Sequence, residues 1–229
     1  FMPLSRFEEL LDEIEGFAPE SVVAIGYRGE PGLHPEITAL IEAVEARRSL
    51  ELYVETSGVG WPSEAVERLK AMELRRTTVI VLLDAATEEA YRRIRGDGFE
   101  EARRFAAVLR EAYPERTYLQ ATRLVEEQDS LEAFYTTYKE ENPIIQKYNH
   151  YCGELPDRRV TDLSPLDRFP CRHLQRDVTI LLDGTVPRCM EDIHGTDIRG
   201  NLFSDGLETI WERGAALFGA HTRGEYPEI

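Results

Sequence analysis

Four polar positions in this sequence lie where predicted strands end, and their side chains are of types that bind charged ligands. They are Glu30, Thr56 or Ser57, Asp84 and Arg123. In a barrel of parallel strands the carboxyl ends of the strands face a common mouth, so we expect these side chains to converge on one ligand. Each could instead be a helix cap or a solvated surface group. Because all four residues follow the ends of successive predicted strands, we favour a binding site.

Two cysteines have the chemistry to hold a metal ion or an iron–sulfur cluster. Cys171 and Cys189 flank residues 178–182 and 185–188, which are predicted to pair as a hairpin through the Asp-Gly turn between them. The hairpin would return the chain toward its starting end, so the two thiolates could share one iron site. Two unrelated buried thiols are an equally good interpretation of the spacing alone. Cys152 is expected to stay outside the site.

The elements that would position the strand-end residues alternate along the chain. Strands are predicted at residues 22–25, 50–54, 77–83 and 118–124, each followed by a helical pattern, and 144–148 is a candidate for a fifth strand. The continuous apolar run of 22–25 is typical of a strand buried on both faces. Repeated strand–helix pairs indicate a parallel sheet or barrel, hence the α/β class. A Rossmann sheet is disfavoured because no G-x-G-x-x-G sequence follows the first strand.

The two ends of the chain differ from this alternating region. Ser5 and Glu8 form a predicted capping box, so the chain is expected to open on a helix. Beyond the alternating region prolines interrupt an irregular segment, and the next long amphipathic helix begins at Leu207. We therefore predict a barrel domain over residues 1–151 and a small irregular α+β domain over 152–229.

Composition limits which binding partners and which cellular location are expected. With 43 acidic and 27 basic residues, the 229-residue chain has a formal net charge of -16, which argues against broad binding to nucleic acid or to an anionic membrane. No apolar run approaches the roughly 20 residues of a membrane span, and no signal peptide opens the chain, so a cytoplasmic protein is expected. Three widely spaced cysteines do not make a disulfide framework.

Several short motifs occur in a characteristic order. They are Gly29-Glu30-Pro31, Glu55-Thr56-Ser57-Gly58, Asp84-Ala85 with Tyr91-Arg92-Arg93-Ile94-Arg95-Gly96, Cys171 with Gly184 and Cys189, and Gly200-Asn201-Leu202 followed by Leu207, Ile210 and Trp211. In this order and spacing they resemble radical S-adenosylmethionine (SAM) enzymes that carry a SPASM extension. The stretch E-T-S-G-V-G-W is most similar to the spiro-SPASM branch. The resemblance covers nearly the whole chain.

The resemblance implies a partial (β/α)6 barrel followed by a small SPASM-like cluster-binding domain. It implies that the motif Gly29-Glu30-Pro31 holds the amino group of SAM, since a cation needs carbonyl and carboxylate acceptors at short range. Thr56, Ser57 and Asp84 would lie near the ribose or methionine end of SAM. Arg123 would meet the SAM carboxylate as a fork-shaped donor.

The activity implied by the resemblance is reductive cleavage of SAM at a [4Fe-4S] cluster to a 5′-deoxyadenosyl radical, which abstracts hydrogen from a substrate. Cys171 and Cys189 would help to hold an auxiliary [4Fe-4S] cluster that anchors substrate or carries an electron. An electron donor such as flavodoxin or ferredoxin is implied as a partner. The substrate is not identified, and related SPASM enzymes make peptides and proteins the first classes to consider.

The sequence departs from the family pattern in three places, and these departures matter as much as the matches. The C-x-x-x-C-x-x-C sequence that binds the radical SAM cluster is absent, the further SPASM cysteines are absent, and Arg28 replaces the first glycine of the usual G-G-E-P. Both cysteine groups would fall beyond the ends of the chain, so we expect a piece of a longer enzyme that is inactive by itself. The alternative is a non-catalytic SAM-like barrel used for binding or as a scaffold. A conventional barrel with Glu30 and Asp84 as an acid/base pair ranks last.

Overall fold

The chain folds into two compact units. The structure, a computed structural model, describes residues 1–161 and 167–226. The first unit, called the sheet unit below, comprises Pro19–Tyr148 and Arg158–Val160. The second, called the cysteine unit, comprises Phe1–Ala18, Asn149–Asp157 and Thr161–Ile229.

This division differs from the predicted boundary between residues 151 and 152. The opening helix belongs to the cysteine unit, where it packs against the last helix of the chain, rather than to the barrel domain. Within the second predicted domain, residues 162–166 and 227–229 lie outside the described residues.

The elements follow one another in a regular order. The sheet unit contains β1 (Val22–Ile25), η1 (Pro31–Leu33), α2 (Ile37–Glu45), β2 (Glu51–Thr56), α3 (Ser63–Ala71), β3 (Thr77–Leu82), α4 (Glu88–Arg95), α5 (Phe99–Ala112), β4 (Thr117–Arg123), α6 (Gln128–Tyr138) and β5 (Pro143–Lys147). The cysteine unit contains α1 (Leu4–Phe17), η2 (Tyr151–Gly153), α7 (His173–Arg176), β6 (Thr185–Pro187), β7 (Ile198–Asn201), α8 (Leu202–Asp205) and α9 (Leu207–Thr222).

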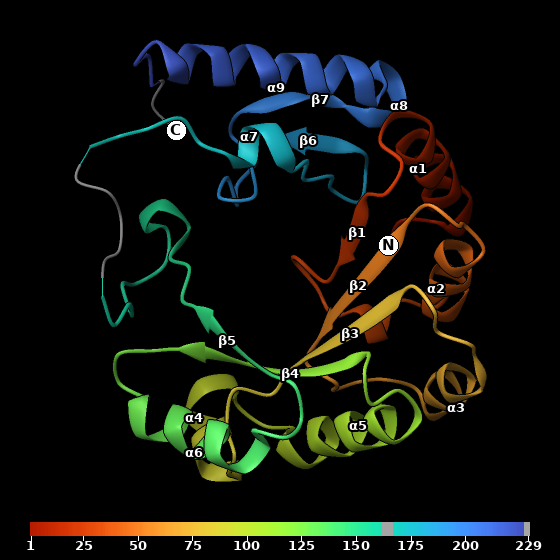
Figure 1. Cartoon of the computed structure of the whole chain (residues 1–229), viewed down its shortest axis with the longest axis vertical. Helices are drawn as coiled ribbons and strands as arrows, with labels where there is room; N and C mark the ends of the chain where they lie inside the picture. Colours follow the sequence, from red (N-terminus) through yellow and green to blue (C-terminus); the bar gives the residue numbers. More distant parts are fainter. Residues whose placement is uncertain (162–166, 227–229) are drawn as a thin grey trace. The chain divides into compact units, whose positions relative to one another are not determined.

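The sheet unit is built on five parallel strands in the order β1-β2-β3-β4-β5. Helices α2 to α6 lie along one side of this sheet, as Figure 1 shows. The predicted α/β class is confirmed, and so are the four strand–helix repeats and the fifth strand. The strand order never reverses, so the sheet has no switch point of the kind at which Rossmann domains bind dinucleotides.

Alternation along each strand separates a helix-covered face from an open face. The buried side chains of the helix-covered face are Leu52, Val54 and Thr56 in β2, Thr77, Val79 and Val81 in β3, and Thr117, Leu119 and Ala121 in β4. The helices meet them with apolar stripes at helical spacing, as in α2, where Ile37, Leu40, Ile41 and Val44 are all buried. The residues between them in each strand lie on the open face, and most of these are only partly buried.

The prediction that residues 22–25 are buried on both faces is wrong. Val23 is buried, whereas Val22 is 49% exposed and Ala24 is also exposed. Strand β1 is an edge strand of the described sheet and pairs only with β2. Its open-face side chains therefore have a strand on one side only.

The predicted capping box at the start of the chain is also wrong. Helix α1 begins at Leu4 with Pro3 as its N-cap, so Ser5 lies inside the first turn. No side chain caps this end. The carbonyl of Pro3 instead accepts the N–H groups of Arg6 and Phe7, each at 3.0 Å.

In the cysteine unit only the turn end of the predicted hairpin forms. The Gly184 N–H donates to the Leu181 carbonyl at 2.9 Å and the Leu181 N–H donates to the Thr185 carbonyl at 2.8 Å, but residues 178–182 form no strand. The strand partner of β6 is β7, which pairs with it antiparallel. The reason is local, because Asn201 Nδ2 donates to the Asp183 carbonyl at 2.9 Å and the Leu202 N–H donates to the Gly184 carbonyl at 2.8 Å. The end of β7 therefore supplies hydrogen-bond donors to both carbonyls of the Asp-Gly turn.

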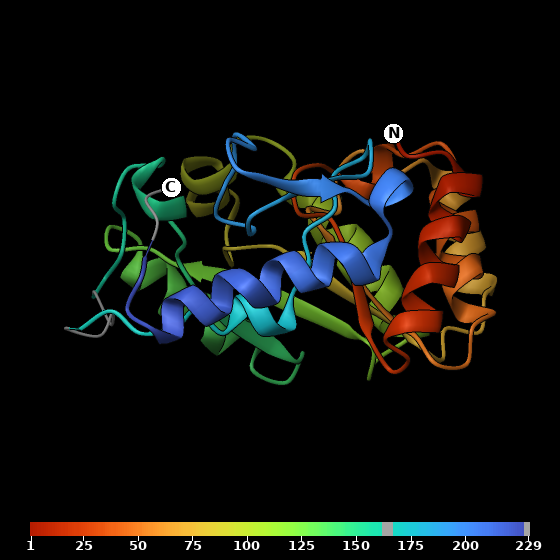
Figure 2. The same ribbon diagram turned by 90° about the horizontal axis from the view of Figure 1, so that it is seen from above.

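Helix α9 organises the rest of the cysteine unit. It starts at Leu207, as predicted, and Figure 2 shows it running alongside α7 and β7, which it contacts. Gly214 sits where α9 meets β7, and a Cβ at this glycine would meet the Arg199 guanidinium at 2.5 Å. No helix within residues 1–161 and 167–226 combines the length and the apolarity that a membrane span requires.

Candidate functional site

The carboxylate of Glu30 ties the loop after β1 to the loop after β2. One oxygen accepts hydrogen bonds from the Gly32 N–H at 3.1 Å, from the Thr56 hydroxyl and from the Trp61 indole N–H at 3.2 Å. The other accepts from the Ser57 N–H at 2.8 Å and from the Ser57 hydroxyl at 2.6 Å. We call these five residues, Glu30, Gly32, Thr56, Ser57 and Trp61, the Glu30 network.

The Glu30 network leaves the carboxylate no spare capacity. A carboxylate offers about four lone-pair sites, and five donors from the chain already point at it. The expected contact between this side chain and the SAM ammonium group would have to displace one of those donors. In this arrangement Glu30 holds two loops in place.

The two glycines that flank Glu30 and Pro31 have different reasons to be glycine. A Cβ at Gly32 would meet the Trp61 ring at 2.5 Å, so packing against the indole excludes any side chain there. A Cβ at Gly29 would meet no atom within 4 Å, and its backbone is not left-handed. Neither the N–H nor the carbonyl of Gly29 has a hydrogen-bond partner among the described residues. The fold of this chain therefore does not account for glycine at position 29.

Asp84 forms a second network at the end of β3. Its side chain is 2% exposed, and one oxygen accepts from Arg95 Nε while the other accepts from the Thr122 N–H, each at 2.5 Å. Asp84 has a left-handed backbone, with φ at 56°, which is uncommon for a residue other than glycine. The ion pair fixes the end of α4 to the ends of β3 and β4.

Tyr91 lies between these two networks. Its side chain is almost completely buried, and burial raises its pKa above the usual range. The charge of Arg95 lowers that pKa, while the negative charges of Asp84 and Glu30 raise it. The strand-end residues Glu30, Thr56, Ser57 and Asp84 thus lie at the same end of the sheet.

Glu30 and Asp84 are poorly placed to act as an acid/base pair. Each carboxylate is already occupied, Glu30 by the five donors of its network and Asp84 by Arg95 and the Thr122 N–H. A general acid or base must be within hydrogen-bond reach of the proton that it transfers. The arrangement therefore speaks against the conventional barrel enzyme.

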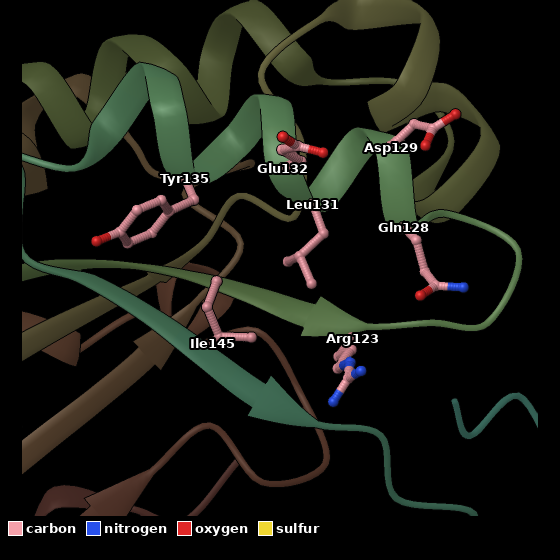
Figure 3. Close-up of a pocket in the computed structure, with 7 residues that line it drawn as sticks. All are labelled: Arg123, Gln128, Asp129, Leu131, Glu132, Tyr135 and Ile145. Carbon is pink, nitrogen blue, oxygen red and sulfur yellow. The ribbon is translucent and has the colours of Figure 1, made fainter. Parts of the chain in front are cut away.

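Arg123 is not part of either network. It is exposed at the end of β4, and its side chain has no hydrogen bond or ion pair with a described residue. It lines a groove with a volume of about 510 Å³ beside α6 and β5, shown in Figure 3. The other lining residues are Gln128, Asp129, Leu131, Glu132, Tyr135 and Ile145. Glu30, Thr56 and Ser57 thus contact one another, whereas Asp84 forms a separate network with Arg95 and the Thr122 N–H. Convergence of these residues and Arg123 on one ligand stays a prediction.

The three cysteines of the cysteine unit are free thiols within electrostatic reach of one another. Cys171 and Cys189 are half-buried and Cys152 is exposed. Burial raises the pKa of both Cys189 and Cys152, and the negative charge of Glu191 raises both further, while backbone hydrogen bonds from Glu191 and Asp192 partly offset the rise at Cys189. Arg199 carries a buried guanidinium whose Nε has no hydrogen-bond partner, and the charges of Cys189 and Cys171 both act on it.

These features fit an iron–sulfur cluster in ligand type but do not complete a site. Thiolates are suitable ligands for iron, and a buried cation without a full set of partners suits a nearby anionic group. Within residues 1–161 and 167–226, however, no three or more His, Cys, Asp or Glu side chains are placed so as to hold a metal ion.

Comparison with known proteins connects this chain with one curated sequence. No protein-family profile matches it. An uncharacterized protein of Treponema pallidum (strain Nichols) is 37% identical over 237 residues, a match that covers 97% of this chain. The chain spans 66% of the length of that relative.

Solved structures with low sequence identity share the fold. Streptococcus suis SuiB bound to the precursor peptide SuiA matches with a TM-score of 0.70 at 14% identity, over 91% of this chain and 57% of SuiB. The protein anSMEcpe with bound AdoMet (SAM) matches with a TM-score of 0.70 at 14% identity, over 97% of this chain and 72% of that chain. SuiB bound to SAM and anSMEcpe bound to AdoMet and the Kp18Cys peptide are also similar. The predicted radical SAM-type partial barrel is therefore confirmed as the fold.

Proposed function

We propose that this chain is the SAM-binding barrel, with part of a SPASM-like region, of a cytoplasmic radical SAM enzyme that acts on a peptide or protein. The fold match supports the SAM-binding part, because SuiB and anSMEcpe were solved with SAM. Their structures with peptides support the substrate class. A reduced flavodoxin or ferredoxin would supply the electron.

The observation that carries the proposal is the unexplained glycine at position 29. The Glu30 network and the buried Pro31 fix the loop, yet the backbone of Gly29 is exposed, has no hydrogen-bond partner among the described residues and has open space where a side chain would lie. A glycine that the fold does not need is expected where a ligand approaches the backbone closely.

We assign the Gly29 carbonyl as the acceptor for the SAM ammonium group and Glu30 as the residue that positions it. Thr56 and Ser57 hold the Glu30 carboxylate from the neighbouring loop, and Asp84 fixes the adjacent strand ends. These residues would hold SAM, which would supply the source of a hydrogen-abstracting radical when reduced at a [4Fe-4S] cluster. An Arg123 contact to the SAM carboxylate remains a prediction.

We also assign Cys171 and Cys189 to one auxiliary cluster, with Arg199 balancing its charge. The thiol chemistry and the partly unsatisfied cation support this assignment. Cys152 is exposed, whereas the other two are half-buried, so we keep it outside the site.

Binding of SAM to substituted chains tests the proposal. Gly29→Ala should lower SAM affinity by about tenfold or more, because a methyl group blocks close approach to the backbone, a loss of at least about 1.4 kcal/mol. It should leave the urea midpoint unchanged or slightly raised, since the position is neither strained nor crowded. The affinity would be measured by NMR titration, which detects weak binding.

Gly16→Ala is the matched control. A Cβ at Gly16 also meets no atom within 4 Å, but this glycine lies in α1 of the cysteine unit. SAM affinity should be unchanged in this variant. Equal SAM affinity in Gly29→Ala and the unsubstituted chain would contradict the assignment of Gly29.

A non-catalytic barrel that keeps SAM recognition is the remaining alternative, and SAM binding does not separate it from the enzyme. The complete reading frame does. A C-x-x-x-C-x-x-C sequence upstream of the helix that begins at Leu4 would favour the enzyme, and its absence would favour the binding module.

A further inference from the structure

Glu55 is a partly buried carboxylate near the end of β2. It is the penultimate residue of β2, and its neighbours in the strand, Val54 and Thr56, are buried on the helix-covered face. Alternation therefore places the Glu55 side chain on the open face of the sheet, one residue from the Glu30 network. It is half-buried there.

The residues that flank Glu55 in the neighbouring strands have no side-chain hydrogen-bond donor for its carboxylate. On the β3 side the register places the apolar Ile80 opposite Glu55. On the β1 side Gly26 has no side chain, and a Cβ there would meet the Glu55 carbonyl oxygen at 2.1 Å. Only glycine allows this approach, and its φ of 123° is one that other residues rarely adopt. The carboxylate is thus flanked by an aliphatic side chain and by bare backbone.

Glu55 also has no compensating charge. No hydrogen bond or ion pair joins its side chain to a described residue. Burial raises its pKa from the usual 4.5, and no nearby cation acts to lower it. A partly buried carboxylate without a partner is unfavourable for the fold, whereas Glu30 nearby is saturated with donors. Such an arrangement is typical of a group whose partner arrives with a ligand.

We propose that Glu55 is the carboxylate that pairs with a cationic group of bound SAM, the role that the sequence suggested for the side chain of Glu30. SAM carries two such groups, the sulfonium and the ammonium. The inference rests on the proposed function, because it takes SAM as the ligand of this end of the sheet. It adds a ligand-binding residue that faces the open side of the sheet from a position outside the Glu30 network.

Stability in the absence of ligand provides the first test. Glu55→Gln keeps the size of the side chain and removes an uncompensated charge, so the urea midpoint near neutral pH should rise. Glu30→Gln is the matched control, and its midpoint should fall because one acceptor oxygen of a saturated carboxylate becomes a donor. A lowered midpoint in Glu55→Gln would show that the carboxylate has a partner within the fold and would overturn the proposal.

Binding of three nucleosides provides the second test. SAM has both cationic groups, S-adenosylhomocysteine lacks the sulfonium charge, and 5′-methylthioadenosine has neither. In Glu55→Gln the affinity for SAM should fall about tenfold or more, since a charge-assisted contact is lost, and that for 5′-methylthioadenosine should stay the same. A loss confined to SAM assigns the sulfonium, and an equal loss for S-adenosylhomocysteine assigns the ammonium.

The outcomes separate this inference from the proposed function. Binding of SAM by the unsubstituted chain with equal affinity in Glu55→Gln would overturn the role of Glu55 and leave the SAM site intact. An equal loss of affinity for all three nucleosides would also overturn it, because charge would not be what Glu55 contributes. Absence of SAM binding by the unsubstituted chain would overturn both the proposed function and this inference.

Discussion

At the scale of single residues, the chemistry of the site depends on which polar groups are already satisfied. Glu30, Thr56 and Ser57 could be predicted from their positions after strands, but their mutual hydrogen bonds could not. Sequence position predicts which residues share an end of a sheet and says little about which donor reaches which oxygen. For this reason the sequence does not indicate that Trp61 belongs to the network, although it follows the same strand by only a few residues.

Trp61 provides a direct test of the network. Its indole N–H donates to the Thr56 hydroxyl at 2.8 Å and to Glu30 at 3.2 Å, while its ring packs on Phe105 with the centroids 4.9 Å apart. Trp61→Phe keeps an aromatic ring and removes the donor, so the free energy of unfolding should fall by about 1–3 kcal/mol. Urea denaturation followed by circular dichroism would measure the change.

Trp211→Phe is the control for the loss of an indole. Its ring lies edge-on to Phe17 with centroids 6.1 Å apart, and its N–H has no hydrogen-bond partner among the described residues. We expect Trp211→Phe to lower the free energy of unfolding less than Trp61→Phe does. A loss in Trp211→Phe as large as that in Trp61→Phe would show that the indole hydrogen bonds contribute nothing specific.

At the scale of secondary structure elements, the order of strands and helices in the sheet unit followed the sequence pattern, whereas in the cysteine unit the start of α9 did so and the strand pairing did not. Helix α2 and strand β3 carry long apolar patterns that few alternative structures satisfy. Strands β6 and β7 are short, and their pairing depends on Asn201, which is distant in sequence from the turn whose carbonyl it binds. Side-chain hydrogen bonds of this kind have no periodic signal in a sequence.

The ion pair between Asp84 and Arg95 should be the main polar link between α4 and the sheet. Asp84→Ala leaves Arg95, which is 26% exposed, without its partner and frees the Thr122 N–H. Breaking a buried pair from one side costs about 3–5 kcal/mol, so the variant should be strongly destabilised in urea. The exposed pair of Glu88 with Arg92 is the control, and Glu88→Gln should leave the urea midpoint unchanged. Equal midpoints for the two variants would contradict a structural role for Asp84.

The link between α4 and α6 should depend on pH in acid. Hydrogen bonds from Arg93 and then from Ser130 lower the pKa of Glu127 from 4.5 to about 2. A lowered carboxyl pKa stabilises the fold above the unfolded value, and this contribution is lost as the pH falls through the folded value. The difference in unfolding free energy between the unsubstituted chain and Glu127→Gln should therefore shrink between pH 4.5 and about 2. A difference that stays constant over this range would contradict the role of the charge.

The assignment of Cys171 and Cys189 to one cluster predicts the iron and sulfide content of cysteine variants of the protein encoded by the complete reading frame. Cys171→Ala, Cys189→Ala and the double variant should lose similar amounts of iron and sulfide, because either loss empties the same auxiliary site. Cys152→Ala should keep the full content. Colorimetric iron and sulfide assays after anaerobic reconstitution would measure it, and additive losses in the double variant would mean that the two cysteines serve different clusters.

At the scale of the whole molecule, the order of elements carries more information than any one motif. Four strand–helix repeats and a fifth strand were predictable, and the chain matches SuiB over 91% of its length at only 14% identity. The division into units was not predictable, since α1 packs with α9 across almost the full length of the sequence. Such long-range packing has no local signature in the residues of either helix.

The central claim, that this chain is the barrel of a radical SAM enzyme, is tested most directly by the release of 5′-deoxyadenosine from SAM. The product of the complete reading frame would be reconstituted with iron and sulfide without oxygen, reduced, and compared with the 229-residue chain treated in the same way. We predict SAM-dependent 5′-deoxyadenosine from the complete protein and none from this chain. No 5′-deoxyadenosine from the reduced complete protein with its cluster in place, or its formation by this chain alone, would contradict the account.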